Sequence, residues 1–240
     1  MKRLLPLLLT GAIALFSFPS FLSSNVRVSK LAESVRPLQV DSAELSEYLL
    51  LKTGRRVKLE AGLINLCSTS YINKNKHYWL TAAHCLEADL TYYIDGQKTS
   101  LVLIDVQNDI AILSTPISSV VRPLKLAKNA PQVCTNGPSD GPNNECKVSM
   151  AGYPFGLQGE NGEPFYVNGV VVQTVAHLSK DKAYMLYSIV GAPGNSGSAV
   201  VNYKGEVVSV LQIGFGSTFG SLEGGSTYEA LAQYEWYFGN

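Results

Sequence analysis

Short apolar runs separated by polar turns dominate the chain from residue 57 onward. The runs are rich in Val, Ile and Tyr, which favour strands. Asp95-Gly96 and Lys204-Gly205 each separate two such runs, and this predicts a β-hairpin at both places. The expected strands cover residues 61–70, 78–81, 90–94, 97–106, 110–113, 121–126, 148–153, 165–178, 184–190, 199–203 and 206–213, and Pro123 suggests an edge or a turn within 121–126. Many short strands predict an all-β fold, built as barrels or a sandwich.

Helical spacing of apolar residues appears on either side of this β-rich region. Asp41 and Glu44 have the spacing of a capping box, and apolar residues follow at helical intervals to residue 52. Ser226 and Glu229 have the same spacing and predict a C-terminal helix to about residue 238. Residues 25–40 are polar and irregular, so we expect residues 25–56 to be a linker, a pro-segment or an N-terminal helix.

The first 24 residues have the pattern of a secretory signal peptide. Lys2 and Arg3 precede an apolar stretch over residues 4–18, and Pro19 and several serines follow it. The stretch is short for a membrane span, and an uncleaved membrane anchor is the alternative. Cleavage after about Ser24 would give a secreted or periplasmic protein over residues 25–240.

Composition and charge exclude several classes of function. Lys and Arg total 19 and Asp and Glu also total 19, so nothing in the charge balance favours a nucleic-acid partner. The three histidines are scattered and the four cysteines form no Cys-x-x-Cys pair, so we expect no metal site and no cofactor. An even number of cysteines in an exported chain favours disulfides, in any of three pairings.

Three residues of the chain have the side chains needed to activate a serine hydroxyl as a nucleophile. A serine hydroxyl needs a neutral imidazole to take its proton, and the imidazole needs a carboxylate to fix its tautomer and stabilise its cation. His84, Asp109 and Ser196 provide these groups in that chain order, within Thr81-Ala82-Ala83-His84-Cys85, Asn108-Asp109-Ile110-Ala111-Ile112-Leu113 and Gly194-Asn195-Ser196-Gly197-Ser198. Asp105 is the rival carboxylate.

These three segments resemble those of the chymotrypsin-fold (trypsin-like) serine proteases, and the Gly205-Glu206-Val207-Val208 hairpin fits the same pattern. The resemblance covers about residues 57–240. It implies two antiparallel six-stranded β-barrels and an active site in the cleft between them. It also implies His84 as general base, Asp109 as its orienting carboxylate and Ser196 as nucleophile. The order His, Asp, Ser separates this family from subtilisin-like proteases and α/β-hydrolases.

The same resemblance assigns roles to backbone groups and to the cysteines. By the family's pattern, the N–H groups of Gly194 and Ser196 form the oxyanion hole. Cys67 and Cys85 match the family's disulfide beside the histidine, which leaves Cys134 to pair with Cys146. Free thiols or a swapped pairing are the alternatives.

Asn195 departs from the digestive and clotting members of the family, which carry an aspartate before the serine. There the aspartate pairs with a new α-amino group made by activation cleavage. With Asn195 in its place, the resemblance implies that this switch is absent. Gly194-Asn195-Ser196-Gly197 is similar instead to bacterial members, including glutamyl endopeptidases and the protease domains of the Deg type.

The family's pattern also suggests two substrate-pocket residues, Val190 and Leu211. Val190 stands six residues before the serine, where a carboxylate would favour Arg or Lys, so we expect no basic preference. Leu211 stands where glutamyl endopeptidases carry a histidine, so we expect no Glu preference either. An apolar or small side chain at the cleavage site is the remaining prediction.

The sequence therefore predicts a secreted or periplasmic serine endopeptidase that acts on a protein or peptide substrate through an acyl-enzyme. One alternative is a pseudo-protease, in which the same fold serves binding and the site is silent. Another is an esterase-like hydrolase with the same three residues. A membrane partner is expected only if the signal segment is uncleaved, and the sequence leaves the oligomeric state open.

Overall fold

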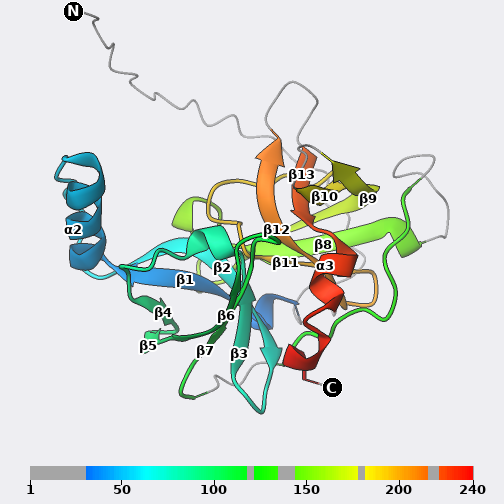
Figure 1. The fold of residues 1–240 in the computed structure, drawn as a ribbon, viewed down its shortest axis with the longest axis horizontal. Coiled ribbons are helices and arrows are strands. Elements are labelled where there is room, and N and C mark those ends of the chain that lie inside the picture. The colour runs from blue at the N-terminus through cyan, green and yellow to red at the C-terminus, as the bar shows by residue number, and fades with distance from the viewer. Residues whose placement is uncertain (1–30, 118–121, 135–143, 178–181, 216–221, 240) are drawn as a thin grey trace, which may run out of the picture.

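The computed structural model describes residues 31–117, 122–134, 144–177, 182–215 and 222–239. Within these residues the chain is mostly β, with one curled sheet, one closed barrel and a few short helices (Figure 1). The predicted all-β fold is confirmed, and its arrangement is the chymotrypsin-like double barrel.

The first sheet has seven strands in the order β5-β4-β1-β2-β3-β7-β6. Their bounds are β1 Val35–Asp41, β2 Leu63–Asn73, β3 Tyr78–Thr81, β4 Tyr92–Ile94, β5 Gln97–Lys98, β6 Ser100–Asp105 and β7 Ile110–Ser114. In the described residues no pairing joins the edge strands β5 and β6, so this sheet is a curled half-barrel. It differs in this respect from the closed six-stranded barrel that the resemblance implied.

The second sheet closes into a six-stranded barrel in the order β10-β13-β12-β11-β8-β9, as expected. Its strands are β8 Lys147–Gly152, β9 Phe165–His177, β10 Ala183–Tyr187, β11 Ala199–Asn202, β12 Val207–Phe215 and β13 Leu222–Ser226. One apolar core cluster includes Trp79 of β3 together with Val201 and Val210 of the second barrel. Apolar packing therefore holds the two sheets together.

Strand β1 is the main departure from the sequence prediction. A polar linker was expected over residues 25–40, whereas β1 pairs with both β2 and β4. Val35, Leu38 and Val40 are fully buried, and the polar side chains of Arg36 and Gln39 are only partly buried. The strand has few apolar residues, but Val35, Leu38 and Val40 all pack in the core. The first sheet therefore already includes the chain at Val35.

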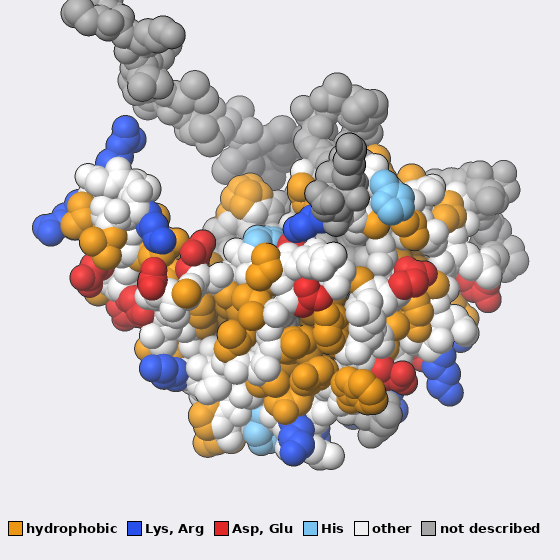
Figure 2. Space-filling view, in the orientation of Figure 1, with side chains coloured by type: hydrophobic (Ala, Val, Ile, Leu, Met, Phe, Trp, Pro, Cys, Tyr) orange, Lys and Arg blue, Asp and Glu red, His pale blue; other side chains and the backbone are white. Residues whose placement is uncertain are grey.

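Helix α2 (Ser42–Thr53) confirms the helix expected over residues 41–52. The Asp41 carboxylate caps it by accepting from the N–H groups of Ala43 at 2.8 Å and Glu44 at 3.3 Å. Glu44 does not complete a capping box, because its carboxylate accepts from the Thr91 N–H at 2.7 Å and ties the helix to the chain before β4. The helix stands away from the body, with basic side chains at its outer end (Figures 1 and 2).

Both predicted hairpins are present. Asp95 and Gly96 have φ values of 52° and 71°, so both occupy the left-handed region that a type I′ turn requires, and β4 and β5 pair across them. Strands β11 and β12 pair across a turn in which Gly205 has a φ of 79°. The turn chemistry of the sequence thus decides the local structure at both sites.

The C-terminal helix is shorter than predicted. Ser226 ends β13, and Thr227 caps helix α3 (Tyr228–Ala232) by accepting from the Ala230 N–H at 3.2 Å. A 3-10 turn follows over Glu235–Tyr237. Leu231 and Phe238 anchor this end of the chain in the core.

Among the described helices none is both long and apolar enough to span a membrane. The expected signal peptide over residues 1–24 lies outside the described residues.

Candidate active site

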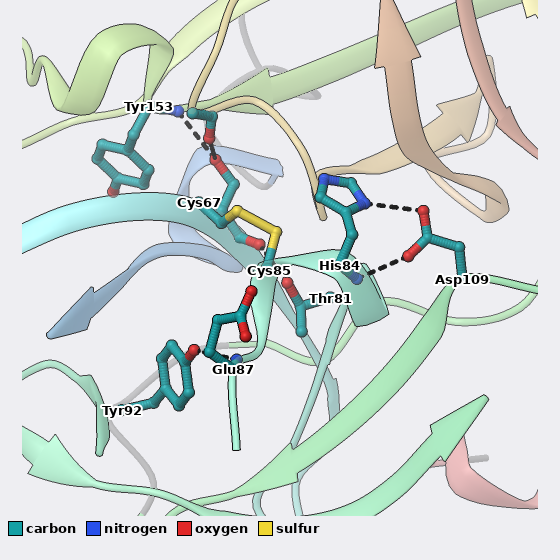
Figure 3. Close-up of a disulfide and its surroundings, with 10 residues drawn as sticks. Cys67, Thr81, His84, Cys85, Glu87, Tyr92, Asp109 and Tyr153 are labelled. Atoms are coloured by element: carbon teal, nitrogen blue, oxygen red, sulfur yellow. Dashed lines mark hydrogen bonds and ion pairs between the residues drawn. A yellow bond between two sulfur atoms is a disulfide. The ribbon is translucent and has the colours of Figure 1, made fainter. Parts of the chain in front are cut away.

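Asp109 holds His84 at two points. His84 lies in the 3-10 turn Ala83–Cys85 that follows β3, and Asp109 directly precedes β7. One carboxylate oxygen of Asp109 lies 2.8 Å from His84 Nδ1, and the other accepts from the His84 backbone N–H at 2.8 Å (Figure 3). Because a carboxylate only accepts, Nδ1 carries a proton, and in the neutral ring Nε2 is the nitrogen that can accept one.

Gln212 supports Asp109 from the other barrel. It lies at an irregularity in the pairing of β12 with β13, between Leu211 and Ile213. Its side-chain Nε2 donates to the carbonyl oxygens of Asn108 at 2.7 Å and Asp109 at 3.0 Å. A register shift in the second barrel therefore supplies a contact that fixes the carboxylate loop of the first sheet. No motif in the sequence marks Gln212 for this position.

The rival carboxylate, Asp105, points into its own loop instead. It accepts from the Asn108 backbone N–H at 3.0 Å and from the Asn108 side chain at 2.6 Å, and the Tyr234 hydroxyl also donates to it. Burial acts to raise the pKa of Asp105, but these hydrogen bonds outweigh burial and leave the pKa below its ordinary value. Asp105 shapes the loop before Asp109 and makes no contact with His84 among the described hydrogen bonds.

Ser68 on β2 fixes the loop that carries Ser196. The Ser68 N–H donates to the Ser196 carbonyl at 2.9 Å, and the Ser68 hydroxyl donates to the Gly194 carbonyl at 2.8 Å. That hydroxyl also accepts from the Tyr153 N–H at 3.0 Å. The Thr81 hydroxyl in turn donates to the Ser68 carbonyl at 2.9 Å. Every polar group of Ser68 is used, and sequence reasoning missed this residue because a single serine within a strand carries no signal.

The Gly194 N–H has no acceptor among the described residues. The Pro193 carbonyl accepts from the Phe155 N–H. In a trans peptide the N–H and C=O groups point in opposite directions, so the Gly194 N–H points away from Phe155. Gly194 has a φ of 98°, and a Cβ there would lie 2.4 Å from the Tyr153 carbonyl oxygen, so only glycine fits.

The Ser196 N–H also points away from a neighbouring hydrogen-bonded carbonyl. The Asn195 carbonyl accepts from the Ser198 N–H at 3.0 Å, which turns the Ser196 N–H to the opposite side of that peptide. In the described part of the chain neither the Gly194 nor the Ser196 N–H donates to any acceptor. These are the two donors expected for an oxyanion hole.

A continuous series of contacts joins the serine loop to the histidine. The Ser196 carbonyl accepts a hydrogen bond from the Ser68 N–H. Cys67, next to Ser68, forms a disulfide with Cys85, and the two Cα atoms lie 6.2 Å apart. Cys85 directly follows His84 (Figure 3). The three predicted residues therefore come from two sheets that meet at one place. Among the described hydrogen bonds none joins Ser196 to His84, and catalytic pairs of this kind often close only around a substrate.

Asn195 is buried, with 3% of its surface exposed. Its side-chain oxygen and the Ser198 hydroxyl are buried without a hydrogen-bond partner in the described residues. Both groups lie against Gly152, where a Cβ would approach the Asn195 oxygen to 2.7 Å. A neutral amide fits this position, because an ionised carboxylate without a partner would cost several kcal/mol more.

The two expected pocket residues lie in different surroundings. Leu211 is 3% exposed and packs in the core of the second barrel, so its side chain does not line an open surface. Its backbone instead holds the serine loop, accepting from Gly197 at 2.9 Å and donating to Ser198 at 2.9 Å. Val190 is 51% exposed rather than forming a closed floor.

Glu223 is a buried acidic residue near this loop that sequence reasoning did not identify. Its carboxylate accepts from the Gly191 N–H at 3.0 Å. Burial raises the pKa of Glu223, and the Gly191 hydrogen bond opposes that rise. The residue reaches the loop because β13 pairs beside β12, a relationship that the sequence does not reveal.

Both disulfides implied by the resemblance, Cys67–Cys85 and Cys134–Cys146, are present. The sulfur atoms of Cys67 and Cys85 and a ring nitrogen of His84 lie within 4.8 Å of one another. Because the two sulfurs are bonded to each other, they are not thiolates that could bind a metal ion.

Comparisons with known proteins agree with this geometry. The family model described as the trypsin-like peptidase domain matches residues 67–210, more than half of the chain. A comparison with curated proteins gives no match. Among solved structures, the active form of the Rv3671c protease from M. tuberculosis is similar, with a TM-score of 0.63 and 17% identity over 87% of this chain and 82% of that chain. At that identity the likeness concerns the fold, and the family match carries the assignment: the chain belongs to the trypsin-like peptidase domain family.

Proposed function

We propose that this protein is a serine endopeptidase that hydrolyses peptide bonds through an acyl-enzyme on Ser196. The observation that carries the proposal is that the Asp109 carboxylate contacts His84 twice, at 2.8 Å from Nδ1 and at 2.8 Å from the backbone nitrogen. This arrangement holds the imidazole in the tautomer in which Nε2 accepts a proton. The His84 side chain is 44% exposed, so it is not a buried core histidine whose hydrogen bonds serve only to satisfy its ring nitrogens.

In the first step the Ser196 hydroxyl oxygen attacks the carbonyl carbon of the scissile bond and passes its proton to His84 Nε2. The imidazolium that forms is stabilised by Asp109. The unpaired N–H groups of Gly194 and Ser196 bind the oxyanion, and each donor is worth roughly 3–4 kcal/mol in the transition state. His84 then gives its proton to the leaving amine, and water hydrolyses the remaining ester by the same steps in reverse.

We further propose that the protein is exported to a secreted or periplasmic location. The pattern of residues 1–24 and the two disulfides support this, because disulfides persist in oxidising compartments.

Labelling with a fluorophosphonate probe tests the enzyme proposal against a silent, binding-only fold. The purified mature protein should be labelled under native conditions, and the Ser196→Ala variant should not. An unlabelled wild type would overturn the proposal. Digestion of a peptide library beside a panel of simple esters then separates an endopeptidase from an esterase, because only the endopeptidase cleaves internal peptide bonds.

A further inference from the structure

Helix α2 and the chain that returns from it form a projection with a basic outer end. Residues 51–58, which we call the basic tip, are all exposed. The tip carries four cationic side chains: Lys52, Arg55, Arg56 and Lys58. No acidic residue stands between Glu47 and Glu60 in the sequence. The helix stands away from both sheets, and its blue basic side chains lie outermost (Figures 1 and 2).

Hydrogen bonds hold the basic tip in a defined shape. Gly54 has a φ of 69°, and its N–H donates to the Leu50 carbonyl at 2.9 Å, which ends the helix and reverses the chain. The Ser46 hydroxyl donates to the Val57 carbonyl at 2.7 Å, so the returning chain lies along the helix. The side chains of the tip are therefore presented together on one scaffold.

Contacts within the protein account for only one of the four cations. The Lys52 ammonium lies 3.9 Å from the Asp89 carboxylate and 5.3 Å from the centre of the Tyr48 ring. It also suits the negative end of the helix dipole. In the described residues the other three cations of the tip form no ion pair. Three unpaired positive charges at one exposed point attract an anionic partner.

Two apolar side chains among these cations indicate which anionic partner fits. Leu51 is 78% exposed and Val57 is 38% exposed. A nucleic acid or an acidic protein would pair with the cations and leave Leu51 in water. An anionic lipid surface takes both kinds of side chain, because its headgroups pair with Lys and Arg while apolar side chains insert at the boundary with the acyl chains.

We propose that the basic tip binds the surface of a membrane that contains anionic lipids and so tethers the protein there. Helix α2 has 12 residues and carries the tip about 18 Å from the end of β1. A flat membrane therefore meets the tip before it meets the sheets. This contact depends neither on the catalytic residues nor on retention of the N-terminal apolar stretch.

Sedimentation with phospholipid vesicles tests the proposal. The purified mature protein is mixed with vesicles of phosphatidylcholine, either alone or with about one third phosphatidylglycerol. The partition coefficient should be at least about tenfold higher for the anionic vesicles. It should fall at least about tenfold between about 0.1 M and about 1 M salt, because the screening length drops from about 10 Å to about 3 Å.

Two variants separate the contributions of charge and apolar contact. Arg55→Gln/Arg56→Gln/Lys58→Gln should bind anionic vesicles roughly 100-fold more weakly, because each cation near the surface contributes about fivefold. Leu51→Ser should weaken binding at least about fivefold with no change in net charge. All four positions are exposed, so both variants should unfold at the wild-type denaturant concentration.

The matched control removes three exposed lysines from other places on the first sheet, by replacing them with glutamine: Lys74, Lys76 and Lys98. It loses the same charge and should bind as wild type does. Equal losses in the two triple variants would overturn the proposal, and so would wild-type protein that does not bind anionic vesicles. Vesicle binding that Leu51→Ser leaves unchanged, or binding to poly-glutamate in place of vesicles, would indicate an acidic macromolecule and would also overturn it. None of these outcomes affects the labelling of Ser196.

Discussion

Gln212 donates a 3.0 Å hydrogen bond from its side chain to the backbone carbonyl of Asp109, and this contact crosses from the second barrel to the first sheet. The carboxylate that orients His84 is thus held in place by the barrel that carries Ser196. Packing of the two sheets against each other therefore also helps to position this carboxylate.

Replacing Gln212 with Leu should leave the Asn108 and Asp109 carbonyls without a partner. One buried and one part-buried acceptor lose their hydrogen bonds, which should cost about 1–3 kcal/mol in the free energy of unfolding. As a positioning residue, Gln212 should also affect kcat more than KM, because it acts through the placement of Asp109. Denaturant unfolding and steady-state kinetics check both effects. A loss of stability with an unchanged kcat would show that the contact is structural only.

Asp109→Asn should reduce fluorophosphonate labelling by roughly 10⁴-fold while the fold survives. Asparagine tolerates the left-handed backbone of this residue, which has a φ of 54°, but its amide cannot hold the imidazole as a carboxylate does. Labelling rates and far-UV circular dichroism provide the measurements. Asp105→Asn is the matched control, and a comparable loss there would contradict the assignment of Asp109.

Gly194→Ala should lower kcat by roughly 10²–10³-fold, because the added Cβ would collide with the Tyr153 carbonyl and displace one oxyanion donor. The control is Gly205→Ala, which has a comparable positive φ of 79° but open space around its Cβ. It should cost about 1–2 kcal/mol of stability and no activity. Equal kinetic effects of the two variants would argue against an oxyanion role for Gly194.

Removing either disulfide should lower the free energy of unfolding by a similar amount, but only one removal should also affect the active site. They close chain separations of 18 and 12 residues, so the chain-entropy model gives about 3 kcal/mol for each. Replacing both members of either pair by serine should lower stability similarly in denaturant unfolding. Only the Cys67/Cys85 double variant should also slow labelling, because Cys85 adjoins His84. Equal labelling rates in the two double variants would contradict this.

Glu223→Gln should change the pH dependence of stability. Burial raises the pKa of Glu223 above 4.5, so the folded state binds more protons than the unfolded state above that pH. Wild-type stability should therefore fall relative to the variant as pH rises from about 4.5 through the raised pKa, and the difference should vanish at lower pH. Unfolding at a series of pH values checks this, and a difference that grows on acidification would have the wrong sign.

Local sequence signals predicted the parts of the fold that depend on nearest neighbours. Asp95-Gly96 specified its turn and Asp41 capped its helix. The disulfide pairing came from the family resemblance, because the cysteine spacing alone allows three pairings. Features that depend on which strands pair could not be predicted from the local sequence. The apolar residues of β1 are few and interrupted by Arg36 and Gln39, so their burial depends on β2 and β4.

The same limit applies to the candidate site. The motifs around His84, Asp109 and Ser196 could be read because each is contiguous. Gln212, Ser68 and Glu223 act across sheets or between neighbouring strands, and each is a common residue type without a local pattern. The C-terminal cap shows a smaller error of this kind: Ser226 has the spacing of a cap, but pairing with β10 and β12 keeps it in β13 and leaves the role to Thr227.

The place of β1 between β2 and β4 constrains how the protein can be matured. A cut that released residues 25–56 as a pro-segment would remove an interior strand and expose the backbone groups of both its neighbours. A mature N-terminus compatible with this sheet lies before Val35. Sequencing the N-terminus of the purified protein would locate it, and a trimmed form starting beyond Asp41 should be degraded rather than activated.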